Sequence, residues 1–260
     1  MGKGTSTGNG VTGGEDHGAE RRAALVTGAS SGIGLAIAAM LGEEGYDLTL
    51  TSRTGPKLEA AAAPLAGRGG AVATVAADVR DPDEVTRVVA AHRDRYGRLD
   101  VLVNNAGLGI VAPLAAIETG HLDLQLAVNL RATILFYREA EPLLRAAGAA
   151  HGEALVVNTS SITGKVGEPE LGVYSATKHG IVGFTQAMQR ELGPAGVKSC
   201  VLCPGFVDTQ LSDYVKDTVP AATMIRAEDV AEAVRSLLRL SPHCVVPEIV
   251  MVQREAVPAP

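Results

Sequence analysis

The chain is poor in aromatic residues and in clustered positive charge. Tryptophan is absent, aromatic residues make up 3% of the 260 residues, and the formal net charge is −6 with a pI near 5.5. Nucleic-acid binding relies on aromatic stacking platforms and basic patches, and anionic membranes also attract basic patches. The composition therefore argues against nucleic acid and against a membrane surface as partners.

Long apolar runs are missing as well. No apolar stretch reaches the roughly 18 residues that a membrane-spanning helix needs. The first 20 residues, MGKGTSTGNGVTGGEDHGAE, are glycine-rich and polar and contain no apolar segment typical of a signal peptide. We therefore expect residues 1–21 to be a disordered tail, residues 22–260 to form a single domain, and the protein to be cytoplasmic.

Cysteine is scarce, with three in the whole chain. Cys200 and Cys203 have the spacing of a metal-binding pair, but they lie in the apolar run VKSCVLC. In a strand, positions three apart point to opposite faces, which is poor geometry for a metal or a disulfide. The six histidines show no paired spacing. We predict no metal site.

What the chain does contain is a regular alternation of short apolar runs and amphipathic segments. Runs that are nearly continuous in valine and leucine are typical of parallel strands buried on both faces. The predicted strands are 23–27, 47–52, 71–77, 100–105, 154–160, 197–203 and 245–252, and the predicted helices are 32–44, 81–97, 119–147, 174–192 and 226–239. This alternation predicts an α/β fold with a doubly wound sheet.

A glycine-rich turn joins the first predicted strand to the first predicted helix. In TGASSGIG, residues 27–34, glycines occupy positions 28, 32 and 34. Glycines let the backbone approach a pyrophosphate, and the N–H groups at a helix start attract the anion. The sequence therefore predicts a dinucleotide site here, although small residues in a tight strand–helix turn would give the same pattern.

Two polar stretches follow the third and fourth predicted strands. Asp78 is the acid of ADV, residues 77–79, and NNAG covers residues 104–107. Ligands of open α/β sheets bind outside the carboxyl ends of the strands. Asp78 could therefore accept a hydrogen bond from an adenine amino group, and 104–107 could form a loop along the cofactor. Ordinary turn chemistry explains each stretch equally well.

Four motifs in order resemble the short-chain dehydrogenases/reductases, the single-domain branch that includes the 3-oxoacyl-carrier-protein reductases. They are TGASSGIG, NNAG, VNTSS followed by YSATK, and PGFVDT, and the resemblance spans about residues 22–240. It implies a Rossmann-type doubly wound sheet of seven mostly parallel strands with helices on both faces. It also implies an enzyme that interconverts a ketone and a secondary alcohol.

The resemblance also implies the catalytic residues. Tyr174 would be the general acid/base, and Lys178, one helical turn away, would lower the pKa of Tyr174 and bind the nicotinamide ribose. Ser161, with Ser160 as the alternative, would bond the substrate oxygen. Asn129 would hold a backbone irregularity and a water that links Lys178 to solvent; a lone buried Asn is more often structural.

The same comparison extends to the cofactor. Pro204 and Gly205 would turn the chain over the nicotinamide, and Thr209 would bond its carboxamide. The complete set of expected cofactor residues is Gly28, Ser30, Ser31, Gly32, Ile33, Gly34, Ser52, Arg53, Asp78, Val79, Asn105, Ala106, Gly107, Tyr174, Lys178, Pro204, Gly205, Val207 and Thr209.

Cofactor choice is predicted from the end of the second strand. NAD-preferring sites place an acidic residue there, whereas this chain has none between Leu48 and Lys57 and places Arg53 beside Ser52. A guanidinium can bind a 2′-phosphate through paired hydrogen bonds. We therefore predict NADP(H), with a solvated loop arginine as the alternative.

The substrate is predicted only by class. It depends on loops 108–116, 162–173 and 206–225, and the segment from Thr209 to about Met224 is expected to be a mobile lid. The charges Lys165, Glu168 and Glu170 in the second loop are either at the site mouth or simply solvated. A 3-oxoacyl thioester, free or tethered to a carrier protein, and an intermediate of specialised metabolism both fit. A dinucleotide-binding regulator without turnover is the alternative function.

The two long predicted helices are expected to form a subunit interface, as the resemblance implies. Their presumed outer faces carry Leu126, Leu130, Phe136, Phe184 and Met188, more apolar surface than a monomer needs. We expect a homotetramer, with a dimer as the alternative.

Overall fold

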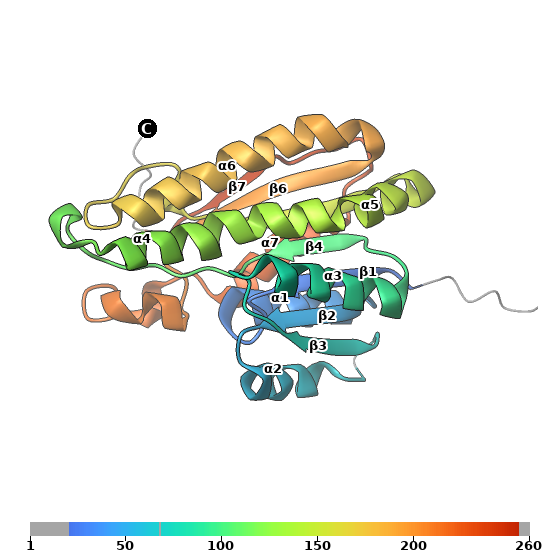
Figure 1. The fold of residues 1–260 in the computed structure, drawn as a ribbon, viewed down its shortest axis with the longest axis horizontal. Helices are drawn as coiled ribbons and strands as arrows, with labels where there is room; N and C mark the ends of the chain where they lie inside the picture. Colours follow the sequence, from blue (N-terminus) through green and yellow to red (C-terminus); the bar gives the residue numbers. More distant parts are fainter. Residues whose placement is uncertain (1–20, 68, 255–260) are drawn as a thin grey trace, which may run out of the picture.

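The computed structural model describes residues 21–67 and 69–254 (Figure 1). Its centre is a sheet of seven parallel strands in the order β3-β2-β1-β4-β5-β6-β7. The strands are β1 (Ala23–Thr27), β2 (Asp47–Ser52), β3 (Val72–Ala76), β4 (Val101–Asn104), β5 (Ala154–Thr159), β6 (Val197–Pro204) and β7 (Glu248–Met251). The predicted doubly wound sheet is confirmed. Of the expected tail, residues 1–21, the first 20 residues lie outside the described residues.

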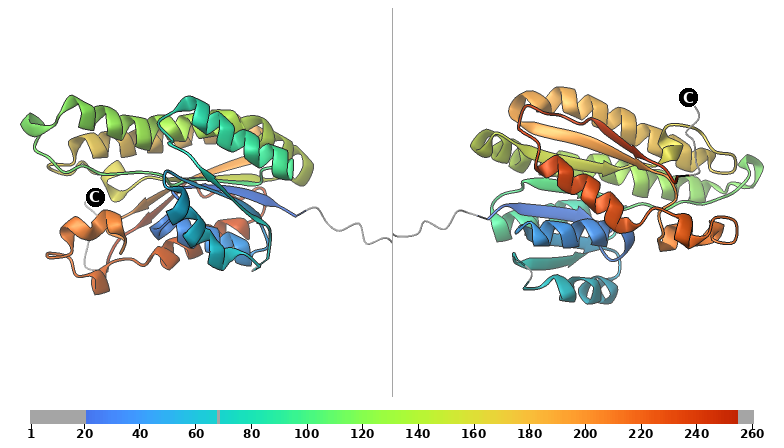
Figure 2. Two further views of the ribbon diagram at one scale, coloured as in Figure 1. Left: turned by 60° about the horizontal axis from the view of Figure 1, so that its bottom comes forward. Right: turned by 180° about the vertical axis from the view of Figure 1, so that it is seen from behind.

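Helices cover both faces of the sheet (Figures 1 and 2). One face packs against α1 (Gly32–Glu43), α2 (Gly55–Ala62) and α7 (Ala227–Leu238), and the other packs against α3 (Pro82–Tyr96), α5 (Ala132–His151) and α6 (Gly172–Leu192). Helix α2 was not predicted, although Pro56 at its start is a helix-initiating signal. Within the described residues, no helix has the length and apolar character needed to cross a membrane.

Along each strand, the side chains of alternate residues point to opposite faces of the sheet. In β1, Ala24 and Val26 join the core under α1, whereas Leu25 joins the core under α3 and α5. The same alternation separates Cys200 from Cys203, which belong to cores on opposite faces of β6. The predicted divergence of this CxxC pair is therefore confirmed.

The prediction of one long helix over residues 119–147 is wrong in two respects. It is divided into α4 (Thr119–Gln125), a π-helical stretch at Leu126–Arg131, and α5, which continues to His151. Gly148 does not end the helix. A Cβ there would collide with the carbonyl oxygen of Ala195, so this glycine lets α5 approach the turn before β6.

Two further expectations need correction. Phe136 is not on an outer face but is 1% exposed in the core against the sheet. The last strand was predicted over 245–252, yet β7 begins only at Glu248. Pro247 precedes it; its carbonyl accepts from the Val201 N–H at 3.0 Å, but proline has no N–H to donate, so the regular ladder begins with Glu248.

A buried histidine links α3 to the sheet. His92 is fully buried; its Nε2 donates to the carbonyl oxygen of Arg98 at 2.8 Å, and its Nδ1 accepts from the Thr49 hydroxyl at 2.8 Å. The neutral imidazole ring makes both hydrogen bonds, since it has one donor and one acceptor nitrogen. Burial lowers the pKa of His92 to about 4 from its ordinary value of 6.5. Protonation of this ring therefore opposes folding.

This burial predicts a pH-dependent loss of stability. The folded pKa lies below the unfolded value, so the unfolded state takes up the proton first as pH falls below 6.5. Between pH 7 and pH 5 His92 should cost about 2 kcal/mol of unfolding free energy. In denaturant titrations, the unfolding free energy of His92→Gln should fall less between pH 7 and pH 5 than that of the wild type. His121→Gln, which changes an exposed histidine, is the control, and its unfolding free energy should fall as much as that of the wild type. An unchanged pH dependence in His92→Gln would contradict the assignment.

Candidate active site

A cavity of about 430 Å³ lies where the winding of the sheet reverses, between β1 and β4. In open α/β sheets this is the place where ligands bind. Every predicted cofactor residue lines the cavity except Gly34 and Asp78. The carboxyl ends of the strands point to the left in Figure 1, where α4 and the orange segment after β6 also lie. Tertiary structure therefore brings almost the whole predicted set together.

The glycine turn is shaped by close backbone approach. Gly28 and Gly32 have positive φ angles of 66° and 56°, a conformation that residues with a Cβ rarely adopt. Gly34 does not reach the cavity. A Cβ on it would stand 2.5 Å from both the Gly28 carbonyl oxygen and Asn105 Nδ2, so its hydrogen atom lets α1 pack against the turn.

The start of α1 is open to an anion. The side chain of Ser31, the N-cap residue, makes no capping hydrogen bond, and the first turn contains no acidic residue. The unbonded N–H groups of this turn carry the positive end of the helix dipole. This is the donor set that a pyrophosphate requires.

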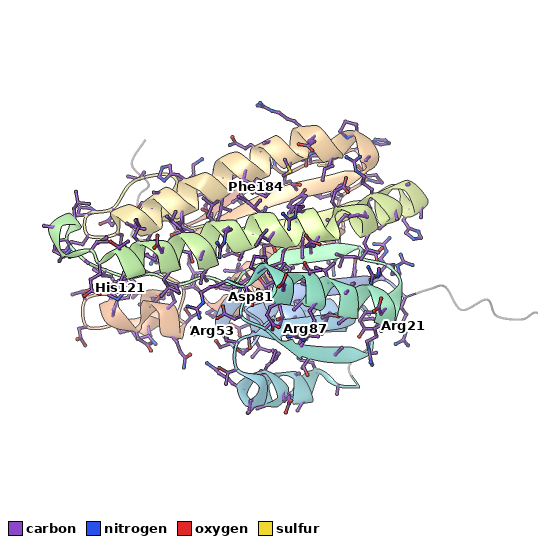
Figure 3. All side chains as sticks on the ribbon, viewed as in Figure 1. Arg21, Arg53, Asp81, Arg87, His121 and Phe184 are labelled. Atoms are coloured by element: carbon purple, nitrogen blue, oxygen red, sulfur yellow. The ribbon has the colours of Figure 1, made fainter. Side chains whose placement is uncertain are left out.

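The end of β2 offers polar groups with unused capacity. Among the described residues, the buried Ser52 Oγ has no hydrogen-bond partner. Arg53 is exposed and lines the cavity beside Ser52, and Figure 3 shows it projecting near the ends of β2 and β3. Lys57 also lines the cavity, and its Nζ donates to Gln210 Oε1 at 2.9 Å. Sequence reasoning missed Lys57 because it missed helix α2.

Asp78 stands apart from the predicted set. Its neighbours Ala77 and Val79 line the cavity, but its carboxylate accepts hydrogen bonds from the Arg80 side chain, at 2.5 to 2.9 Å. This bond is the main cause of the lowered pKa of Asp78. A contact between Asp78 and an adenine amino group stays a prediction, and it would have to share the carboxylate with Arg80.

Tyr174 and Lys178 lie one turn apart on α6, side by side. Lys178 Nζ is 5.4 Å from the centre of the Tyr174 ring and donates to the carbonyl oxygen of Thr159, at the end of β5, at 2.9 Å. The lysine is 3% exposed. The ring of Tyr174 packs against Gly109, where a Cβ would stand 3.5 Å from the ring. The two side chains are thus held from opposite sides.

Asn129 lies in a backbone irregularity, the π-helical stretch after α4. Its side chain is fully buried, accepts from the Leu108 N–H at 2.9 Å, and donates to the Leu108 carbonyl at 2.9 Å and to Thr177 Oγ1 at 3.1 Å. Asn129 Oδ1 and Lys178 Nζ flank Gly107, within 3.4 and 3.5 Å of the point where a Cβ would stand. The relay role of Asn129 stays a prediction.

The two adjacent serines have different surroundings. Ser160 Oγ donates to the Lys178 carbonyl at 2.8 Å, which ties β5 to α6. Ser161 Oγ makes only a long contact of 3.5 Å with the Pro204 carbonyl and accepts from the Thr163 N–H at 3.2 Å. Ser161 also interacts with the Tyr174 hydroxyl. The geometry favours Ser161 over Ser160 as the residue that meets a ligand.

Burial controls the protonation of this pair. It raises the pKa of Tyr174 to about 12, against a smaller lowering by Ser161, and it lowers the pKa of Lys178 to about 8. The lowering of the Tyr174 pKa by Lys178 together with a bound nicotinamide stays a prediction. Without ligand, desolvation opposes the charged form of each group and is the largest cause of both pKa shifts.

A second cavity, of about 1160 Å³, adjoins the first. Ser161, Tyr174, Gly205 and Leu211 line both. The remaining wall comes mainly from the three loops predicted to hold the substrate, together with residues of β7 and after it. The segment predicted as a lid contains two short 3-10 helices, Gln210–Val215 and Ala221–Thr223. Of the predicted mouth charges, Lys165 and Glu168 line this cavity.

Comparison with known proteins agrees with this geometry. The family model described as short chain dehydrogenase matches residues 22–220. The chain therefore belongs to the short-chain dehydrogenase/reductase family of oxidoreductases. The match spans the glycine turn, the predicted catalytic residues and the first part of the segment over the second cavity.

Three similar proteins illustrate the family. A Streptomyces virginiae protein named as the ketoacyl reductase of a monensin polyketide synthase is 39% identical over 202 residues, 77% of this chain and 76% of its own. The actinorhodin polyketide ketoreductase, solved as a point variant with NADPH, is 31% identical with a TM-score of 0.81, over 90% and 96% of the two chains. The Brucella melitensis 3-ketoacyl-(acyl-carrier-protein) reductase, solved with NADH, is 28% identical with a TM-score of 0.83, over 92% and 99%.

The close packing at Gly34 can be tested without any ligand. Gly34→Ala should lower the unfolding free energy by about 1–3 kcal/mol because the added methyl group meets backbone and Asn105. Gly42→Ala in the same helix is the matched control. Its Cβ would have an ordinary contact of 3.7 Å with Leu48, so this change should be neutral or stabilising by up to about 1 kcal/mol. Equal effects in urea titrations of the two variants would refute the packing role of Gly34.

Proposed function

We propose that this protein is an NADP(H)-dependent ketoreductase that interconverts a ketone and a secondary alcohol. The observation that carries the proposal is the junction of the two cavities, where Ser161 and Tyr174 line both. A dinucleotide in the smaller cavity and a carbonyl compound in the larger one would meet at these hydroxyls. A protein that only bound a dinucleotide would have no need of this junction.

The residues of the smaller cavity fit NADP(H). The uncapped start of α1 suits the pyrophosphate, and Ser52 Oγ and Arg53 suit a phosphate on the adenosine ribose. The relatives were solved with NADPH in one case and with NADH in another, so family membership alone leaves both open. The absence of an acidic residue after β2 supports NADP(H).

When bound, the cofactor supplies a hydride to the carbonyl carbon. Ser161 donates a hydrogen bond to the carbonyl oxygen and so stabilises the negative charge that develops on it. Tyr174, whose pKa of about 12 keeps it protonated at neutral pH, donates its proton to the same oxygen. Lys178, held by the Thr159 carbonyl, stabilises the phenolate that results, and Asn129 positions the loop beside Lys178.

Loss of the Tyr174 hydroxyl should stop proton transfer. Tyr174→Phe should lower kcat by about 10²-fold or more while the dissociation constant for NADPH stays within a few-fold. Ser161→Ala should lower kcat far more than Ser160→Ala, because only the Ser161 hydroxyl is free to meet substrate. Spectrophotometric NADPH oxidation and fluorescence titration measure the two quantities. Undiminished turnover by Tyr174→Phe would rule out its assigned role.

Cofactor preference should follow Arg53. A charge-assisted contact contributes roughly 1.5–3 kcal/mol, or about 10- to 100-fold tighter binding of NADPH than of NADH. Arg53→Ala should remove most of this preference and Arg53→Asp should reverse it. Arg87→Ala is the control, since Arg87 pairs with Glu84 away from the cavity. Equal wild-type dissociation constants for NADPH and NADH would refute the assignment.

The proposal includes substrate and assembly. A 3-oxoacyl thioester and an intermediate of specialised metabolism remain the two substrate classes, because relatives are named as ketoacyl reductases of polyketide synthases and of acyl-carrier proteins. We also propose a homotetramer through α5 and α6. Leu126, just before α5, and Ile134, in its first turn, each expose 38% of their surface. A monomeric mass by light scattering at micromolar concentration would refute the assembly.

A further inference from the structure

The second cavity gathers much of the exposed apolar surface of the described chain. Nine large hydrophobic side chains are exposed among the described residues, and five of them line this cavity: Val111, Val166, Leu211, Tyr214 and Val250. They come from the loops after β4 and β5, the segment after β6, and β7 itself. Apolar side chains concentrated at one concave site indicate an apolar ligand.

The size of the second cavity also indicates what kind of ligand it takes. Its volume of about 1160 Å³ exceeds the range of roughly 300–1,000 Å³ that is usual for small-molecule sites. A small acyl group would leave most of the space and most of the apolar wall in contact with water. The cavity therefore fits a bulky ring system or a long carbon chain.

Charge around the cavity is acidic or already paired. Segments 162–173 and 206–226 together carry five carboxylates and three cations. Each of the three cations has an ion-pair partner: Lys165 with Glu248, Lys216 with Asp208 and Asp213, and Arg226 with Asp229. Glu168, Glu170 and Asp217 have no ion-pair partner among the described residues. Of these three carboxylates only Glu168 lines the cavity, and the two segments give the wall no unpaired cation for an anionic ligand.

Arg254 is the exception. It lines the cavity, is exposed, and has no ion-pair partner within the part of the chain that the structure describes. Glu168 lines the same cavity, so the two unpaired charges of the wall cancel. A coenzyme A thioester brings three phosphate groups, and a carrier-bound thioester brings a phosphodiester. A single arginine supplies little positive charge to balance the phosphates of either thioester.

One buried hydroxyl in the wall has no partner. Thr163 is 8% exposed and lines the cavity, and within the described chain its Oγ1 has no hydrogen-bond partner. Its backbone N–H bonds the Ser161 hydroxyl at 3.2 Å, so Thr163 is next to the site of reaction. A buried hydroxyl without a partner is costly, and a ligand oxygen that reached Thr163 Oγ1 would remove this cost.

We infer that the substrate is a bulky, uncharged ketone that enters the cavity as a free molecule and carries a second oxygen for Thr163. This inference rests on the proposed function and narrows it to one of its two substrate classes. The apolar wall holds the carbon skeleton, Ser161 and Tyr174 hold the reacting oxygen, and Thr163 Oγ1 holds the second. Coenzyme A and carrier-protein thioesters are poor substrates because the described wall offers their phosphates one unpaired cation, Arg254, and sets the unpaired carboxylate of Glu168 against it.

The charge component is tested with two thioesters that share one reacting group. Acetoacetyl-N-acetylcysteamine is uncharged, and acetoacetyl-coenzyme A carries the phosphates. The uncharged thioester should have the higher kcat/KM by about 10-fold or more at low salt, and the gap should narrow as salt screens repulsion. Glu168→Gln should raise kcat/KM for the coenzyme A thioester alone. A preference for the coenzyme A thioester that falls with salt and is lost in Arg254→Ala would overturn the inference.

The apolar component and the second oxygen are tested with neutral ketones. Ethyl benzoylacetate should exceed ethyl acetoacetate in kcat/KM by about 10-fold or more, since both are 3-oxo esters and differ in apolar bulk. Thr163→Val should raise KM for ethyl benzoylacetate several-fold with little change in kcat. The same variant should leave KM for 2-tetralone almost unchanged, because this ketone has no second oxygen. Thr223→Val is the control, because Thr223 Oγ1 already donates to Pro220. It should shift both KM values equally.

The outcomes separate this inference from the proposed function. Turnover of the coenzyme A or carrier-bound thioester in preference to all neutral ketones would overturn the inference and leave the ketoreductase proposal standing. Oxidation of NADPH with none of the carbonyl compounds would overturn both. Equal KM shifts for ethyl benzoylacetate and 2-tetralone in Thr163→Val would remove the second oxygen from the proposed substrate.

Discussion

The close approach of two loops at the centre of the sheet is the constraint on which the site depends. The turn after β1 and the loop after β4 touch where the winding reverses, and Thr27 Oγ1 accepts from the N–H groups of both Asn105 and Ala106 at 3.0 Å. A Cβ on Gly28 would stand 2.9 Å from Ala106. This contact fixes the start of α1 against the sheet, and thereby forms the floor of the first cavity.

The proposed catalytic pair, Tyr174 and Lys178, depends on a second contact layer built on that floor. Lys178 is buried beside Gly107, and its ammonium is satisfied by the Thr159 carbonyl at the end of the neighbouring strand β5. A charge in this position is stable only because a backbone acceptor and the loop held by Asn129 surround it. The same burial that lowers the pKa of Lys178 raises that of Tyr174, which suits a tyrosine that must hold a proton at neutral pH.

The two cavities differ in electrostatic character although they share Ser161 and Tyr174. Arg53 and Lys57 line the first, whereas the segments beside the second carry an excess of carboxylates. An anionic dinucleotide and an uncharged ketone are thereby favoured at different ends of one cleft. Gln210, which accepts a hydrogen bond from Lys57, links the wall of the first cavity to the segment over the second.

The sequence by itself determined the succession of elements along the chain and most of the site. Local hydrophobic runs placed all seven strands, and all but the last agree with the structure to within one residue at each end, because burial on both faces leaves a continuous apolar pattern. Most of the predicted site residues between Gly28 and Thr209 came instead from motifs that resemble the short-chain dehydrogenases/reductases, and each motif can be recognised because it is a local stretch of sequence.

Tertiary structure decided what depends on contacts between distant segments. Only packing showed that Gly148 sits inside α5 against Ala195, that Phe136 faces the sheet, and that Lys57 reaches the first cavity. Only packing brought loops from four parts of the chain around Thr163. The protonation of Tyr174 and Lys178 was decided there too, because desolvation depends on everything that surrounds a group and is written in no local stretch of sequence.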